Sequence, residues 1–222
     1  MPLGRWSVRA RLSLGLLALF WAAMVLAMFS YAGGSWLYPR APSHDFFANF
    51  WCDLLREPAH NGLPNARSVQ LAQVGFGAIA LSQAFFWLEA ARLLSPLGAR
   101  FLRVAGVTSA LATAVVALIP SDRFPALHAP AVLTAGGLGF VCGCVVSGWA
   151  LRHHREMPGF ALSALVLILA AAINLVLYVK VVYFIPGETI VLPAAQKVAS
   201  LALVVWMVAG LGAAQAPDRA DI

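Results

Sequence analysis

Six long apolar runs, each of about 20 residues or more, constrain the fold of this chain more than any other feature. The hydrocarbon core of a bilayer is about 30 Å thick and needs roughly 20 apolar residues per helix. Inside lipid every backbone N–H and C=O must be bonded within the protein, and runs without the alternation of barrel strands must therefore be helices. We predict an all-α, six-helix membrane bundle forming a single domain over 1–222, with spans at 12–31, 69–93, 101–119, 129–151, 160–185 and 190–213.

The composition agrees with a chain whose solvent is a membrane. Hydrophobic residues make up 61% of it and charged residues only 11%, a balance that excludes an ordinary soluble domain. The net charge of +6 comes from short arginine clusters between the apolar runs, which indicates topology and not nucleic-acid binding. A cleaved signal peptide is an alternative interpretation of the first run, but its apolar stretch is longer than usual for one, which favours an anchor.

The distribution of basic residues predicts the orientation of the bundle. Nine arginines fall on the side that holds both termini and the connections after the second and fourth runs, and four fall on the other side. Because Lys and Arg are enriched in cytoplasmic loops, we expect both termini in the cytoplasm of a multi-pass protein of the inner (plasma) membrane. The nine are Arg5, Arg9, Arg11, Arg92, Arg100, Arg103, Arg152, Arg155 and Arg219, and the four are Arg40, Arg56, Arg67 and Arg123.

The longest connection, 32–68, is predicted to lie outside. Its prolines and glycines exclude one continuous helix. The stretch HDFFANFWCDLL within it mixes aromatic residues with carboxylates, which suits a short interfacial helix or a cap over the bundle. A connection of this length with aromatic residues is typical of a functional loop.

The fourth span contains small residues at the spacing used by closely packed helices. Gly139 and Gly143 are four residues apart, which predicts close approach of a neighbouring helix. Packing inside the bundle is the first interpretation of this face, and contact with a second copy in a homo-oligomer is the alternative.

Most polar residues collect at the predicted outer end, where we place the candidate site. Asp53, Asp122 and His128 are candidate catalytic residues, since a carboxylate beside a histidine can activate water for attack on a lipid ester, amide or phosphodiester. A second set of residues can bind the anionic headgroup of a membrane lipid without catalysing a reaction. That set comprises Arg123, Lys180, Gln196 and Lys197.

Other interpretations of these polar residues remain open. Histidines and carboxylates at the outer end are suitable zinc ligands. No HxxxH or HExxH spacing places two of them on one helix face, however, and the sequence does not indicate which cofactor the protein uses. Lys180 and Lys197 lie below the ends of their spans and can snorkel outward without any function. Ion pairs that hold loops to helices, or a small transporter, are further alternatives.

Several short motifs resemble those of a family of six-span bacterial membrane proteins of unknown function. The motifs are NFWCDLL and NGLPN before the second span, IPSDRFPALH between the third and fourth, and PAAQK at the start of the last. This family is broadly similar to the Frag1/DRAM/Sfk1 group, and the resemblance covers about residues 30–212. Where the family has Ser-Asp-Leu in the first motif, this chain has Cys52 before Asp53.

The resemblance implies a compact six-helix bundle and names the positions of its polar residues. These are Asp53, Asp122, His128, Gln196 and Lys197. It supplies no reaction. Because eukaryotic members of the broader group are associated with lipid remodelling, lipid distribution and membrane trafficking, the resemblance implies membrane lipids as partners by analogy.

Overall fold

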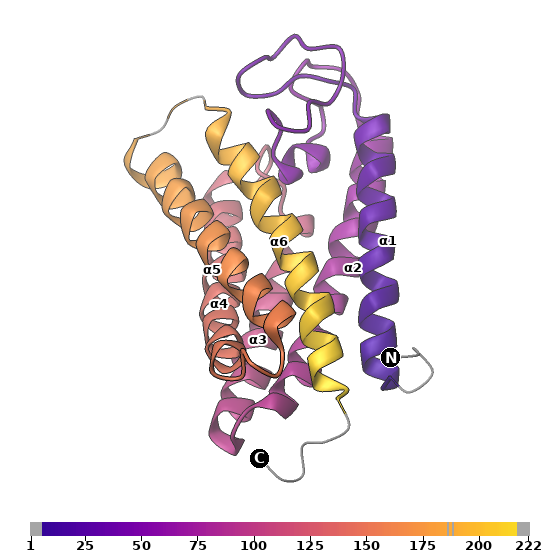
Figure 1. Ribbon diagram of the computed structural model, residues 1–222. Helices are drawn as coiled ribbons and strands as arrows, with labels where there is room; N and C mark the ends of the chain where they lie inside the picture. The colour runs from indigo at the N-terminus through magenta and orange to yellow at the C-terminus, as the bar shows by residue number, and fades with distance from the viewer. Residues whose placement is uncertain (1–5, 186, 188, 217–222) are drawn as a thin grey trace.

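The structure is a computed structural model that describes residues 6–185, 187 and 189–216. It confirms the all-helical fold, with six helices long and apolar enough to cross a membrane, and the chain is therefore a multi-pass membrane protein (Figure 1). The helices are α1 (Val8–Ser30), α2 (Ala66–Ala90), α3 (Pro96–Leu118), α4 (Pro125–Arg152), α5 (Pro158–Val179) and α6 (Val191–Ala214). Three short elements accompany them: η2 (Trp51–Leu55), η3 (Ala91–Leu93) and η4 (Lys180–Phe184).

Most helices begin a few residues before the apolar run that predicts them, because their first turns are fixed by capping. The Ser7 side chain accepts a hydrogen bond from the N–H of Ala10 and starts α1. Proline occupies the first turn of α3, α4 and α5, where its missing N–H costs nothing. The predicted fifth span divides into the α-helix α5 and the π-helical turn η4.

The helices pack mainly against their neighbours in sequence, and α6 closes the bundle by contacting α5, α2 and α1. Figure 1 shows residues 31–65 folded over one end of the bundle, and the start of α1 and the end of α6 at the other; we call these the loop end and the terminal end. The α1–α2 pair is tied by two fully buried serines, since each of the Ser13 and Ser82 hydroxyls donates to the other residue's backbone carbonyl at 2.8–2.9 Å. At the terminal end, Glu89 and Arg92 form an ion pair with an Nη1–Oε2 distance of 3.1 Å.

The glycine-rich face of α4 meets a neighbouring helix at only one of the two predicted positions. A Cβ added to Gly139 would lie 2.9 Å from the Ser109 hydroxyl of α3, whereas one added to Gly143 would meet nothing within 4 Å. Gly143 instead faces a cavity. The closest helix contact through a glycine lies elsewhere, at Gly106 of α3, where a Cβ would lie 2.5 Å from Cγ of Trp87.

The connection between α1 and α2, for which the sequence predicts a short interfacial helix or a cap, folds over one end of the bundle. We call residues 31–65 the loop cap. Its 3₁₀ helix η2 buries Trp51, Leu54 and Leu55 among the loop-end parts of α1 and α2. A loop that buries two leucines and a tryptophan is part of the hydrophobic core, so it holds a fixed position over the helices.

Candidate functional site

Three side chains on one face of α6 fix the loop cap to the bundle. The Gln196 carbonyl oxygen accepts a hydrogen bond from the N–H of Trp51 at 3.0 Å. The Lys197 ammonium donates to the backbone carbonyl of Asn49 at 2.6 Å, and the Trp51 indole N–H donates to the Ser200 hydroxyl at 3.0 Å. The start of α6 therefore sets the position of η2.

Lys197 is a fully buried cation with an environment built for its charge. Its side chain is only 1% exposed, and it does not snorkel. The Nζ atom lies 4.2 Å from the ring centroid of Trp51 and 5.5 Å from that of Phe46, so two aromatic faces stabilise the charge. Lys180, the other predicted lysine, is exposed on η4. The two lysines are therefore not together.

Asp53 is the centre of a hydrogen-bond network within the loop cap. Its Oδ1 lies 3.0 Å from Nε2 of His60. Its Oδ2 accepts hydrogen bonds from the Asn49 amide at 3.0 Å and the Phe50 N–H at 2.9 Å. Both oxygens of this 3%-exposed carboxylate thus have partners, which indicates that it organises the loop.

Asp122 and His128 are not hydrogen-bonded to each other in the described structure, and each bonds to a backbone group instead. Asp122 Oδ2 accepts a 3.3 Å hydrogen bond from the Glu57 N–H and lies 4.0 Å from Nε of Arg123, whose side chain is otherwise exposed. His128 Nδ1 lies 2.7 Å from the carbonyl oxygen of Ile119. Because a carbonyl only accepts, Nδ1 carries the hydrogen, and in the neutral ring Nε2 is left as an acceptor.

Burial shifts the pKa values of Cys52, Tyr31 and His44, which lie near this network, so that these three groups are neutral near pH 7. It raises the pKa of the Cys52 thiol to about 12, and the charge of Asp53 adds to this shift. Burial also raises the pKa of Tyr31 to about 12. It lowers the pKa of His44 to about 4, with a contribution from the nearby Lys197 charge. A thiol with so high a pKa is not a ready nucleophile.

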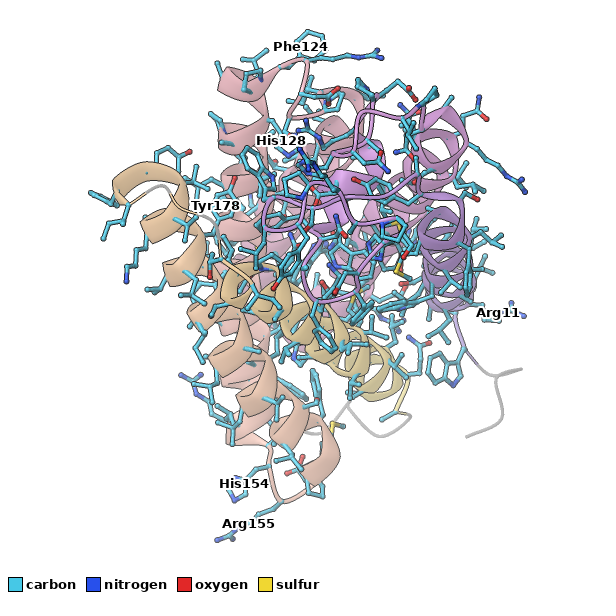
Figure 2. All side chains as sticks on the ribbon, turned by 90° about the horizontal axis from the view of Figure 1, so that it is seen from above. Arg11, Phe124, His128, His154, Arg155 and Tyr178 are labelled. Carbon is cyan, nitrogen blue, oxygen red and sulfur yellow. The ribbon has the colours of Figure 1, made fainter. Side chains whose placement is uncertain are left out.

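A cavity of about 500 Å³ opens beside this network, and we call it the loop-end cavity. Figure 2 looks down on the loop end and shows His128 toward the middle of the molecule and Tyr178 near the ends of α4 and α5. The Tyr178 hydroxyl donates to the Ala129 carbonyl at 3.4 Å, which links those two helices. The polar residues in the cavity wall are Asp53, Arg56, Ser121, His128, Tyr178, Thr189 and Gln196.

A second cavity of about 280 Å³ lies deeper, between α2, α3, α4, α5 and α6, and we call it the midbundle cavity. Its wall runs along α6 from Gln196 to Trp206, which at 1.5 Å per residue is about 15 Å. Most of this wall is apolar or glycine, and the hydroxyls of Ser109, Thr113 and Ser200 in it already donate to oxygens of the protein. The residues common to both cavities are Cys52, Val132 and Gln196.

The candidate residues from the sequence are thus only partly brought together. Asp53, His128 and Gln196 line the loop-end cavity, while Lys180, Lys197 and Arg123 are absent from its described wall. Glu188, which the sequence also places at this end, lies outside the described residues. Within the described ranges no group of three or more His, Cys, Asp or Glu side chains is arranged to hold a metal ion.

Sequence reasoning missed two residues that matter at this site. Asn49 supplies both a carbonyl for Lys197 and an amide for Asp53. Arg56 lines the loop-end cavity although it was counted only as a topological charge. The sequence signal for this position is that Arg56 directly follows the segment WCDLL, whose Cys52 and Asp53 line the same loop-end cavity.

No family model, curated protein or solved structure matches this chain. The resemblance to six-span proteins similar to the Frag1/DRAM/Sfk1 group therefore stays a prediction.

Proposed function

We propose that this protein binds a membrane lipid, with the headgroup in the loop-end cavity and an alkyl chain in the midbundle cavity. One observation carries the proposal: the loop-end cavity, with Asp53, Arg56 and His128 in its wall, and the midbundle cavity, with no charged residue in its described wall, share the wall residues Cys52, Val132 and Gln196. A compartment with ionisable side chains next to an elongated one without them matches the two chemical halves of an amphiphile. The roles of lipid carrier, lipid-binding regulator and assistant in envelope processing all require this binding step.

The walls of the midbundle cavity support an alkyl chain as its occupant. A hydrophilic solute would need free hydrogen-bonding groups along its path. The Ser109 hydroxyl instead donates to the Ala135 carbonyl at 2.7 Å, and the Thr113 hydroxyl donates to the Gln83 side chain at 3.2 Å. Three buried atoms of this wall have no hydrogen-bond partner, the indole nitrogens of Trp87 and Trp206 and Oδ1 of Asn174. Most of the other wall residues are apolar or glycine, so the surface left for a ligand is chiefly hydrocarbon.

We further propose that the loop end faces the outside of the inner (plasma) membrane and that both termini are cytoplasmic. The excess of arginine at the terminal end supports this orientation. The headgroup would then come from the outer leaflet.

The test is to fill the midbundle cavity. Gly143 lines it, and a Cβ there meets nothing within 4 Å, so Gly143→Leu adds a side chain to the cavity without a clash at its first atom. The protein is purified in a mild nonionic detergent, and the retained lipid is extracted and quantified by mass spectrometry. We expect Gly143→Leu to retain at least about fivefold less lipid per protein than the wild type, since it removes the space for the chain.

Gly148→Leu is the matched control. It makes the same change on the same helix, has equal free space around its Cβ, and lies outside the cavity wall. It should retain lipid at the wild-type level, with an unchanged thermal midpoint in both variants. Equal lipid retention by wild type and both variants would contradict the proposal.

A further inference from the structure

We infer that Arg56 is the headgroup-recognition residue and that it selects a phosphate-bearing lipid. This inference rests on the proposed lipid binding and adds the chemical class of the headgroup. Arg56 follows η2 directly and lines the loop-end cavity. Among the described residues its guanidinium has no salt bridge, and its Nε is buried without a hydrogen-bond partner.

A buried guanidinium nitrogen without a partner is costly, which points to a ligand that supplies an acceptor. An unsatisfied buried polar group lowers stability, and more so when the group is charged. The backbone of Arg56 is fixed, because its N–H donates to the Asp53 carbonyl at 3.1 Å and its carbonyl accepts from the Asn65 amide at 2.9 Å. The backbone therefore fixes the point at the cavity wall from which the Arg56 side chain extends.

Asp53, the one carboxylate in the described cavity wall, is not the acceptor for the Arg56 guanidinium. Asp53 lies three residues before Arg56, yet its oxygens bond to His60, Asn49 and the Phe50 N–H. Its negative charge opposes an incoming anion, but the buried Lys197 ammonium at the same network offsets that charge. Arg56 is left as the cation without a described counter-ion in the cavity.

The geometry of arginine favours phosphate over other headgroups. A guanidinium presents several N–H donors in a planar fork, which matches two oxygens of one phosphate, while an ammonium or a neutral hydroxyl headgroup gives it no comparable acceptor. The Gln196 side chain lies in the same wall. Its carbonyl oxygen already accepts from Trp51, so its amide is the end available to a further acceptor.

The experiment compares lipids that differ only in the phosphate. Purified protein in a nonionic detergent is titrated with phosphatidic acid, with diacylglycerol of the same acyl chains, and with inorganic phosphate, and binding is followed by native mass spectrometry. We expect the wild type to bind phosphatidic acid at least about tenfold more tightly than diacylglycerol, because a charge-assisted hydrogen bond is lost with the phosphate. Arg56→Gln should abolish that preference without changing diacylglycerol binding.

Arg123→Gln is the control, since it removes one positive charge at the same end from an exposed side chain outside the cavity wall. It should keep the preference. If Arg56→Gln keeps it too, or if diacylglycerol binds the wild type as tightly as phosphatidic acid, the assignment of Arg56 is overturned while lipid binding stands. If inorganic phosphate binds as tightly as phosphatidic acid, the conclusion that the bound phosphate belongs to a lipid is overturned. Binding of neither lipid would overturn the proposed function itself.

Discussion

Lys197 shows how one buried charge can hold a membrane protein together. An ionisable side chain in a span is costly unless it is paired or hydrated. Here Lys197 has a carbonyl partner at 2.6 Å, an aromatic face at 4.2 Å and the carboxylate network of Asp53 nearby. All three partners belong to the loop cap, so the Lys197 ammonium of α6 is stabilised only when the loop cap is packed against the helices.

Replacing this lysine should destabilise the protein strongly. In Lys197→Met the Asn49 carbonyl loses its donor and the buried Asp53 loses its compensating charge, so we expect a loss of about 3 kcal/mol or more in the free energy of unfolding. The measurement is reversible unfolding in mixed micelles, followed by circular dichroism.

Lys180→Met provides the comparison, because Lys180 is exposed and its removal should change the stability by less than about 0.5 kcal/mol. Similar stabilities for the two variants would show that Lys197 does not hold the loop cap.

His44 should make the stability depend on pH. Its folded-state pKa of about 4 lies below the ordinary value of 6.5, so between these values the unfolded state binds more protons than the folded state. The stability contributed by His44 is therefore full above about pH 6.5 and falls as the pH drops to about 4, by at most about 1.4 kcal/mol per pH unit.

The check is the thermal midpoint in detergent as a function of pH. His44→Phe keeps an aromatic ring beside Tyr31 and should flatten the curve between pH 6.5 and 4. His154→Phe, at an exposed position of the terminal end, should leave the curve as in the wild type. A curve for His44→Phe as steep as the wild-type curve would rule out this histidine as the cause.

At the scale of helices, the sequence predicts the elements well and their contacts less well. Apolar run length alone places all six helices, because the bilayer fixes that length. The glycine pattern on α4 is less informative, since glycine permits a close neighbour but does not require one. Both glycines line the midbundle cavity, but only Gly139 has such a neighbour, and nothing in their common spacing distinguishes them.

Gly106 is the position where a small residue is required. We expect Gly106→Ala to lose about 1–2 kcal/mol of stability, because its Cβ would overlap the Trp87 side chain and force α2 and α3 apart. Gly137→Ala, where a Cβ meets nothing within 4 Å, should instead be neutral or gain up to about 1 kcal/mol from helix propensity. Unfolding of both variants in mixed micelles measures the difference, and a neutral Gly106→Ala would contradict the close contact.

At the scale of the whole molecule, the sequence predicts which end carries the polar residues but not which of them share a space. Asp53, His128 and Gln196 do line one cavity. Lys197 and Gln196 both bond to the loop cap, but only Gln196 also lines the cavity, because the Lys197 side chain is enclosed by the loop. That difference depends on how the loop folds back, and a contact between residues 148 positions apart leaves no local pattern in the sequence.

The attachment of the loop cap to α6 has a consequence for how the protein is made. Synthesis runs from the N-terminus, so Asn49 and Trp51 leave the ribosome long before Gln196 and Lys197. Until the last helix inserts, the loop has no partner on α6, and the wall shared by the two cavities is incomplete. The proposed lipid binding therefore requires that insertion of the last helix is finished.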